Sequence, residues 1–294
     1  MIEIQDVPSS FLNFDIVNYP PHNKSKGIEA YFYKYLENEN IYKSNLCYLP
    51  IQWTSYLISK NYGQDIEDLE KFCSNLIINN PHKKFFTIVQ YDGGPLVKIN
   101  NCIIFSSGGM FNTPKLNNQS YIDLPLITAP HNYEGNDKKK YKVSYLGRNT
   151  HPVRKTIEKK LSNIDGYLIK NIKSDGINNR DTKRFRKIMS SSIFSLCPRG
   201  YGPASFRFYE SLEMGAIPIY ISDDFVLPYS DILDWNKLCL LIRLDEIDSI
   251  PEKVNKIIES NKHIEMSKYG KNCFKKYFNT DFMSKKIIET VEKF

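Results

Sequence analysis

Two features of exported and membrane proteins are lacking in this sequence. No apolar run approaches the roughly 20 residues that a membrane-spanning helix needs. The first residues, MIEIQDVPSS, contain no basic region followed by an apolar segment, which is the pattern of a secretory signal peptide. We therefore expect no integral membrane segment and no signal or anchor, and predict a soluble, cytoplasmic protein.

Closely spaced cysteines are also lacking. The six cysteines lie far apart, form no CxxC pair and have no histidine at metal-ligand spacing. In a chain of 294 residues this pattern predicts reduced, mostly buried thiols rather than a disulfide framework or a zinc site. Their positions are Cys47, Cys73, Cys102, Cys197, Cys239 and Cys273.

Long basic runs are scarce, although Lys and Arg number 40 against 33 Asp and Glu. The net charge of +7 is spread thinly, and its longest basic run is only Lys138–Lys140. No zinc-finger spacing or RNA-binding aromatic signature accompanies it, so we predict no nucleic-acid partner. A positive excess also suits an anionic ligand or a membrane surface.

The sequence does contain an alternation of helical and β patterns, and its 294 residues are enough for two domains. In the first half, periodicity predicts helices over 27–36 and 66–77, and β-rich runs predict strands over 85–91 and 101–107. The polar stretch Pro130–Lys140 interrupts the pattern.

A second alternation follows that stretch. Strands are expected over 141–147, 166–170 and 192–197, and helices over 151–161, 182–189, 251–260, 264–277 and 282–291. We therefore predict one α/β domain over 1–135, a second α/β domain over 136–270, and a C-terminal helix within 271–294.

The segment SLCPRGYGPASFRFYESLEMGAIPIYISDD, residues 195–224, concentrates the chemistry. A buried strand ends in a loop with Gly200 and Gly202, a helix runs from about Ala204 to Met214, and a second buried strand follows Gly215. Strands joined in this way are parallel, and ligands of parallel sheets bind beyond the carboxyl ends of the strands. The glycines and the helix N-terminus suit a diphosphate.

Three polar residues lie on the first turns of this helix. Ser205 can cap the helix or contact a phosphate, Arg207 can fork two phosphate oxygens, and Glu210 lies on the same face. A carboxylate there can accept hydrogen bonds from both hydroxyls of a ribose. The alternative is a surface ion pair between Arg207 and Glu210 beside a structural turn.

The same segment closely resembles the signature of exostosin-like glycosyltransferases, family 47. That signature is a strand ending in Cys-Pro, a Gly, Ser-x-Arg-x-x-Glu, a Gly-x-x-Pro strand, an acidic residue and Leu-Pro-Tyr. Here it comprises Cys197, Pro198, Gly200, Ser205, Arg207, Glu210, Gly215, Pro218, Asp223, Leu227, Pro228 and Tyr229.

The resemblance implies a GT-B fold, in which two Rossmann-like domains face each other across a cleft. The acceptor-side domain would be 1–135 and the nucleotide-sugar-binding domain 136–270, and the C-terminal helix within 271–294 would pack back on the first domain. It implies inverting, metal-independent transfer of a hexosyl or glucuronyl group from a UDP-linked donor to a glycan acceptor, with no cofactor. By position, Arg207 would hold the diphosphate and Glu210 the ribose, while Arg148 would add a phosphate contact. Asp223 and Asp224, after the second buried strand, would contact donor sugar hydroxyls or cap the next turn.

Inverting transfer also needs a general base. Asp92, just past the strand predicted over 85–91 and before Gly93-Gly94, is the candidate; its alternative role is turn formation. Other candidates are Glu29, which we expect on a solvated helix face, and His131, which we expect in the linker.

Two other functions stay open. A GDP-fucose-type transferase also uses a Glu-bearing helix followed by a Gly-x-x-Pro strand. A carbohydrate-binding protein of the same fold would have lost its catalytic base.

Overall fold

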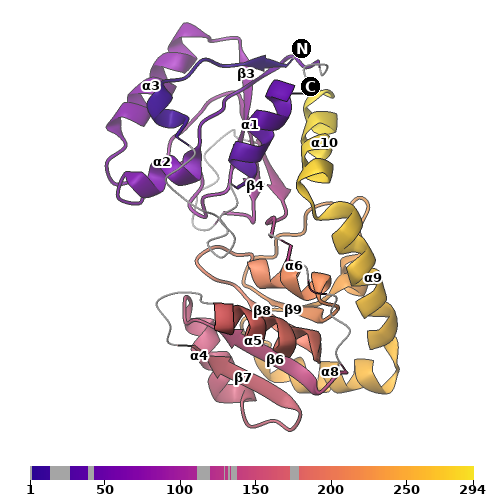
Figure 1. Ribbon diagram of the computed structural model, residues 1–294. Coiled ribbons are helices and arrows are strands. Elements are labelled where there is room, and N and C mark those ends of the chain that lie inside the picture. Colours follow the sequence, from indigo (N-terminus) through magenta and orange to yellow (C-terminus); the bar gives the residue numbers. More distant parts are fainter. Residues whose placement is uncertain are drawn as a thin grey trace. The chain divides into compact units, whose positions relative to one another are not determined.

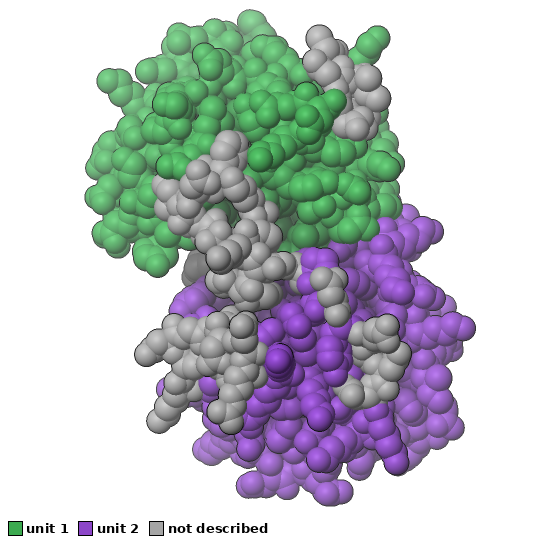
Figure 2. All heavy atoms as spheres, in the orientation of Figure 1, with its two compact units in different colours: residues 1–127, 279–294 green, residues 128–278 purple. Residues whose placement is uncertain are grey.

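The computed structural model describes residues 2–13, 27–38, 43–110, 120–128, 130–131, 133, 138–172 and 179–294, the side chains of residues 179–181 excepted. The chain divides into two compact units, which Figure 2 colours separately. Unit 1 comprises Met1–Ile127 and Asn279–Phe294, and unit 2 comprises Thr128–Phe278. From the sequence, these boundaries were placed at 135/136 and 270/271. The second one falls inside a single helix, α9, which remains whole in unit 2.

Unit 1 is built on a parallel five-stranded sheet whose spatial order follows the chain, β1-β2-β3-β4-β5. Figure 1 labels β3 and β4 of this sheet. The strands are β1 (Glu3–Ile4), β2 (Leu46–Tyr48), β3 (Lys84–Val89), β4 (Cys102–Ser107) and β5 (Ser120–Leu124). The helices are η1 (Ser9–Phe11), α1 (Ile28–Asn38), α2 (Trp53–Ser59), α3 (Glu67–Asn79) and α10 (Thr280–Val291).

Side chains that alternate along β3 are buried in two separate cores, one on each face of the sheet. Phe85 and Val89 pack with residues of α2 and α3. Phe86 and Ile88 pack with residues of α1 and α10. This is the two-residue period of a strand covered by helices on both faces.

Unit 2 contains a second parallel sheet, in the order β10-β9-β8-β6-β7. Its strands are β6 (Tyr141–Gly147), β7 (Tyr167–Asn171), β8 (Ser192–Pro198), β9 (Ile217–Ile221) and β10 (Leu240–Ile242). Its helices are α4 (Pro152–Leu161), α5 (Asn179–Ser190), α6 (Phe206–Glu213), α7 (Trp235–Leu238), η2 (Ile247–Ser249), α8 (Ile250–Glu259) and α9 (Lys262–Tyr277).

The strand order of unit 2 reverses at β6. From β6 the chain first adds β7 on one side, and then adds β8, β9 and β10 in turn on the other side. The carboxyl ends of β6 and β8 therefore flank a topological switch point, where open parallel sheets bind ligands. The α/β class, with two units that each contain a parallel sheet, is confirmed.

All six cysteines are buried and free. Among the described residues, no helix combines the length and the apolar character that crossing a membrane requires.

Candidate active site

The segments that follow β6, β8 and β9, together with the first turn of α6, meet at the carboxyl edge of the unit 2 sheet. The β6–α4 loop contains Arg148 and His151, and the segment after β8 begins with Arg199 and Gly200. Asp223 follows β9, and Arg207 lies in the first turn of α6. Parallel pairing of β6 with β8, and of β8 with β9, places the ends of these strands side by side.

Arg207 is held in a fixed position at the end of β6. Its guanidinium carbon lies 4.9 Å from the ring centroid of Tyr145 and 4.9 Å from that of Phe185. Its Nη2 donates a hydrogen bond to the carbonyl oxygen of Leu146. No carboxylate among the described residues forms an ion pair with it, so its charge is balanced by two aromatic faces and one carbonyl.

The last residue of β6, Gly147, makes this position of Arg207 possible. A Cβ at Gly147 would lie 2.6 Å from Oη of Tyr145 and 2.9 Å from Nη2 of Arg207. Both contacts are too short for any residue with a side chain. Gly147 is therefore required for the close approach of the guanidinium to the strand.

Glu210 lies one turn further along α6 and is only 6% exposed. Its Oε1 lies 2.9 Å from Nε2 of His131. The backbone N–H of His131 donates to Oε1 of Glu213 at 2.8 Å, and Nε of Arg186 donates to Nδ1 of the His131 ring at 3.1 Å. The alternative prediction, a surface ion pair between Arg207 and Glu210, is wrong, because Glu210 is buried and bonded to His131.

Ser205 is the N-cap residue of α6, which begins at Phe206, two residues later than predicted. Its backbone is extended (φ −138°, ψ 134°), and its hydroxyl makes no capping hydrogen bond. Helix capping, one of the two roles predicted for this hydroxyl, is therefore not observed. Contact with a ligand remains a prediction.

Arg154, from the first turns of α4, ties two of the loops together. Its Nη1 donates to the carbonyl of Arg148 at 2.9 Å, its Nη2 to that of Pro198 at 3.1 Å, and its Nε to that of Arg199 at 3.1 Å. Burial lowers the pKa of this guanidinium. Arg154 thus fixes the spacing of the two chain segments that flank the switch point.

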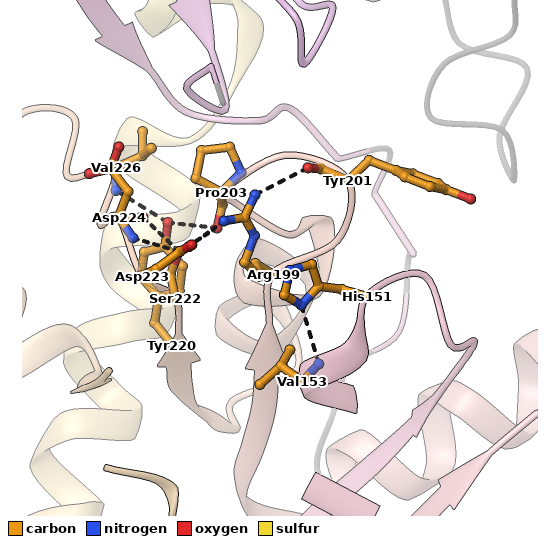
Figure 3. Close-up of polar contacts among 10 residues, drawn as sticks. All are labelled: His151, Val153, Arg199, Tyr201, Pro203, Tyr220, Ser222, Asp223, Asp224 and Val226. Atoms are coloured by element: carbon orange, nitrogen blue, oxygen red, sulfur yellow. Dashed lines mark hydrogen bonds and ion pairs between the residues drawn. The ribbon is translucent and has the colours of Figure 1, made fainter. Parts of the chain in front are cut away.

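Arg199 forms the centre of a second cluster, shown in Figure 3, between His151 and Asp223. Its Nη1 donates to Asp223 Oδ1, and its Nη2 donates to the carbonyl of Tyr201 at 3.3 Å. Arg199 is 8% exposed, and its buried Nε has no hydrogen-bond partner among the described residues. A buried N–H donor without a partner, at the edge of the sheet where ligands bind, is a candidate for ligand contact.

The charges in this cluster shift two pKa values. Partial burial raises the pKa of Asp223, but the hydrogen bond and charge of Arg199 outweigh it, so the pKa lies below its usual value. Burial, followed by the charge of Arg199, lowers the pKa of His151. Asp223 is therefore ionised and His151 neutral near pH 7.

The loop after β8 is held by hydrogen bonds at Pro203, while Tyr201 in the same loop is exposed. The hydroxyls of Tyr220 and Ser222 each donate to the carbonyl of Pro203 at 3.2 Å. Tyr201 is 70% exposed, and its ring points away from the cluster in Figure 3. The loop therefore has a fixed backbone and presents one aromatic side chain to solvent.

Comparison with known proteins identifies the family. The exostosin GT47 domain matches residues 82–258, which is more than half of the chain. The chain belongs to the exostosin GT47 family. The predicted resemblance to this family is confirmed.

The curated relatives match a shorter segment. An Exostosin-1 homolog of Caenorhabditis elegans is 39% identical over 72 residues, which are 24% of this chain and 19% of that protein. The Probable glucuronosyltransferase GUT1 of Oryza sativa subsp. japonica is 37% identical over 62 residues, which are 21% of this chain and 15% of that protein. The matches thus span less than a fifth of these relatives' length. Among solved structures, TarM aligns with a TM-score of 0.43 at 12% identity, covering 92% of this chain and 60% of that chain.

Most of the exostosin-family residues singled out in the sequence lie together. Arg148, Gly200, Ser205, Arg207, Glu210 and Asp223 are all at the carboxyl edge of the unit 2 sheet or on α6. Asp92 lies in unit 1, within a turn after β3 in which Gly94 N–H donates to the carbonyl of Tyr91 at 2.9 Å. The ligand roles of these residues remain predictions.

Sequence reasoning missed three members of the site, His151, Arg154 and Arg199, and considered His131 only as a general base. His151 and Arg154 lie in the segment YLGRNTHPVR with the predicted Arg148, and Arg199 directly follows the predicted Pro198, so closeness to these residues was the available signal. His131 was expected in the linker, but it is 5% exposed and bonded to Glu210. Nothing in the local sequence shows that contact, because the two residues are 79 positions apart.

Glu29 was expected on a solvated helix face, and that expectation is wrong. It is 4% exposed at the start of α1, where it accepts hydrogen bonds from Thr54 N–H (3.0 Å), Thr54 Oγ1 (2.8 Å) and Gln90 N–H (2.7 Å). Burial raises the pKa of Glu29 to about 7, although these hydrogen bonds act to lower it. Its carboxylate joins α1 to the first turn of α2, through Thr54, and to Gln90, the residue after β3.

Proposed function

We propose that this chain is an inverting glycosyltransferase that transfers a sugar from a UDP-linked donor to a hydroxyl group of a glycan acceptor. One observation carries the proposal: Arg207 is immobilised at the switch point of a parallel sheet, one helical turn from a buried carboxylate, Glu210. Family membership supplies the reaction class.

In this proposal Arg207 stabilises the departing diphosphate. Negative charge grows on the leaving group as the glycosidic bond breaks, and a cation that is already fixed in place lowers the barrier most effectively. The N-terminus of α6 adds a partial positive charge. Arg199, through its unpartnered Nε, and the exposed Arg148 supply further donors.

Glu210 is proposed to bind the ribose. A buried carboxylate accepts two hydroxyl hydrogen bonds strongly, because water does not compete for it. The hydrogen bond from His131 occupies part of Oε1 and sets the orientation of the group. The spacing of three residues between Arg207 and Glu210 suits a ribose and its adjoining phosphates on one face of a helix.

Asp92 is proposed as the general base. Glu29 is the other acidic candidate of unit 1, but three protein donors already bind its enclosed carboxylate, which suits a structural role. We expect Asp92→Asn to lower kcat about 10²- to 10⁴-fold, because proton transfer to a base contributes about that much. The measurement is sugar transfer alongside UDP affinity, which should stay within about twofold of the parent value if Asp92 acts in chemistry alone. An unchanged kcat would remove Asp92 from this role.

Metal independence is likewise a proposal, and it rests on the resemblance to the family. No group of three or more His, Cys, Asp or Glu side chains suited to a metal ion occurs in the part of the chain that the structure describes. Transfer measured with EDTA, and again with added Mn²⁺ or Mg²⁺, tests the proposal. Activity that requires an added metal ion would contradict it.

Nucleotide binding tests the donor site directly. Isothermal titration with UDP, GDP and CMP should show preference for UDP, and Arg207→Ala should weaken UDP binding about tenfold to a hundredfold, because it removes a charged hydrogen-bond donor. Arg243→Ala is the matched control, since Arg243 is exposed just beyond the edge strand β10.

Three outcomes are informative. Binding of GDP alone would support the fucosyltransferase-like alternative. Binding of no nucleotide would contradict the donor site and favour a carbohydrate-binding protein. If UDP binds, UDP-glucuronic acid and UDP-hexoses are the donors to compare first, because several relatives are named probable glucuronosyltransferases.

A further inference from the structure

His131 is buried against the face of α6 that carries Glu210. The two side chains are 4% and 8% exposed, and Nε2 of His131 lies 2.9 Å from Oε1 of Glu210. The backbone N–H of His131 donates to Oε1 of Glu213, which is the next residue on that face of the helix. Ring and backbone of His131 are therefore both fixed to α6.

The partner of the other ring nitrogen decides the direction of the hydrogen bond. Nε of Arg186 always carries a proton, and it donates to Nδ1 of His131 at 3.1 Å. Nδ1 must therefore be the acceptor, which leaves the ring proton on Nε2, facing Glu210. His131 is held as a donor to the carboxylate.

The same histidine also lies next to the residues that hold Arg207. The ring centroids of His131 and Phe185 are 5.8 Å apart, and the guanidinium of Arg207 stacks on the ring of Phe185. Phe185 and Arg186 are neighbours on α5. One helix thus supports both the cation and the histidine.

We propose that His131 is a positioning residue that fixes the carboxylate of Glu210 to receive the ribose hydroxyls of the donor nucleotide. The inference rests on the proposed function. A carboxylate on a flexible side chain would otherwise have several rotamers to choose from, and ordering it would reduce the affinity for the ligand. With Oε1 anchored by Nε2–H, the plane of the carboxylate is set before the nucleotide arrives.

The readout is discrimination between UDP and 2′-deoxy-UDP, which differ by one ribose hydroxyl. The parent protein should bind UDP at least about tenfold more tightly, because a site built to bond a hydroxyl rejects the analogue that lacks it. His131→Ala should reduce that ratio to within about threefold, while the Kd for 2′-deoxy-UDP changes little. His131→Gln should restore much of the ratio, since its amide N–H can reach the place of Nε2–H.

Three further variants serve as controls and as an independent test. Glu210→Gln should abolish discrimination, and His82→Ala, at an exposed histidine before β3, should leave it unchanged. Arg186→Ala removes the donor to Nδ1 while His131 stays in place, so the ratio should fall in this variant as well. If circular dichroism shows that His131→Ala does not fold, Arg186→Ala provides the test in its place.

The outcomes separate the inference from the proposed function. A parent protein that discriminates, with a ratio lost in Glu210→Gln but kept in both His131→Ala and Arg186→Ala, overturns the role of His131 alone. Equal weakening of both nucleotides in His131→Ala overturns it too, since that shows a general structural role. A parent protein that binds UDP and 2′-deoxy-UDP equally overturns the ribose role of Glu210, and the inference with it.

Discussion

Glu29 shows how burial and hydrogen bonding compete at a single residue. Its carboxylate accepts three hydrogen bonds from Thr54 and Gln90, which favour the charged form, yet burial outweighs them and raises the pKa to about 7. The unfolded chain gives this group its ordinary pKa of 4.5. Between these two values the folded protein retains a proton that the unfolded chain has released, so the stability of unit 1 must fall as the pH rises from 4.5 to 7.

We expect Glu29→Gln to remove this component of the pH dependence, which amounts to about 3 kcal/mol over the whole window. Urea unfolding at pH 5 and pH 8 should therefore show a smaller loss of unfolding free energy in the variant than in its parent. Trp53 is buried in unit 1, so a Trp235→Phe background leaves it as the only tryptophan reporter. Glu70→Gln, at an exposed position on α3, is the control. Parallel pH profiles for parent and Glu29→Gln would contradict the expectation.

At the scale of elements, longer segments could be predicted and shorter ones could not. Residues 141–147 form β6 as predicted, because a seven-residue β pattern that ends in Gly147 is a clear signal. Strands β1, β2 and β10 are two or three residues long, too short to show a period, and they form because they pair with longer neighbours. The strand–loop–helix–strand unit containing Arg207 was therefore visible, whereas its link to His131 depends on tertiary contacts.

The two glycines of the site make different demands on their loops. Gly147 has no room for a Cβ, since Tyr145 Oη and Arg207 Nη2 would lie within 3 Å of it. At Gly200 the nearest atoms to a Cβ are Arg154 Nη2 at 3.4 Å and Thr150 Oγ1 at 3.5 Å, which are ordinary contacts. Alanine at 147 would therefore force Tyr145 or Arg207 to move, whereas alanine at 200 fits without a close contact.

We expect Gly147→Ala to displace Arg207 and weaken UDP binding about tenfold or more, because binding depends on the prior placement of the cation. Gly200→Ala should leave the melting temperature unchanged, so that any loss of UDP affinity in this variant reports close approach of the ligand to the loop. Calorimetric titration and thermal melting measure the two effects separately. Unchanged UDP affinity in Gly147→Ala would show that the position of Arg207 is not limiting.

At the scale of the whole molecule, the chain returns to unit 1 after completing unit 2. Helix α10 places Met283, Ile287, Ile288 and Val291 in the same core as residues of α1 and β3, each of the four being fully or almost fully buried. The hydroxyl of Ser44 also bonds the carbonyl of Val291 at 2.6 Å. Unit 1 therefore depends on residues from both ends of the sequence, while the core of unit 2 is continuous in the chain.

This asymmetry predicts the effect of shortening the chain. Ending it at Phe278 removes four buried apolar side chains from unit 1, each contributing about 1.5–3 kcal/mol, and the sum is comparable with the total stability of a typical domain. We expect unit 1 of this variant to unfold, with exposure of Trp53 and rapid proteolysis before residue 128, while unit 2 stays resistant to protease and still binds UDP. A chain that ends at Val291 loses only the exposed residues 292–294 and should behave like the parent. If Trp53 stays buried in the chain ending at Phe278, unit 1 folds without α10, and the helix covers a core that is already complete.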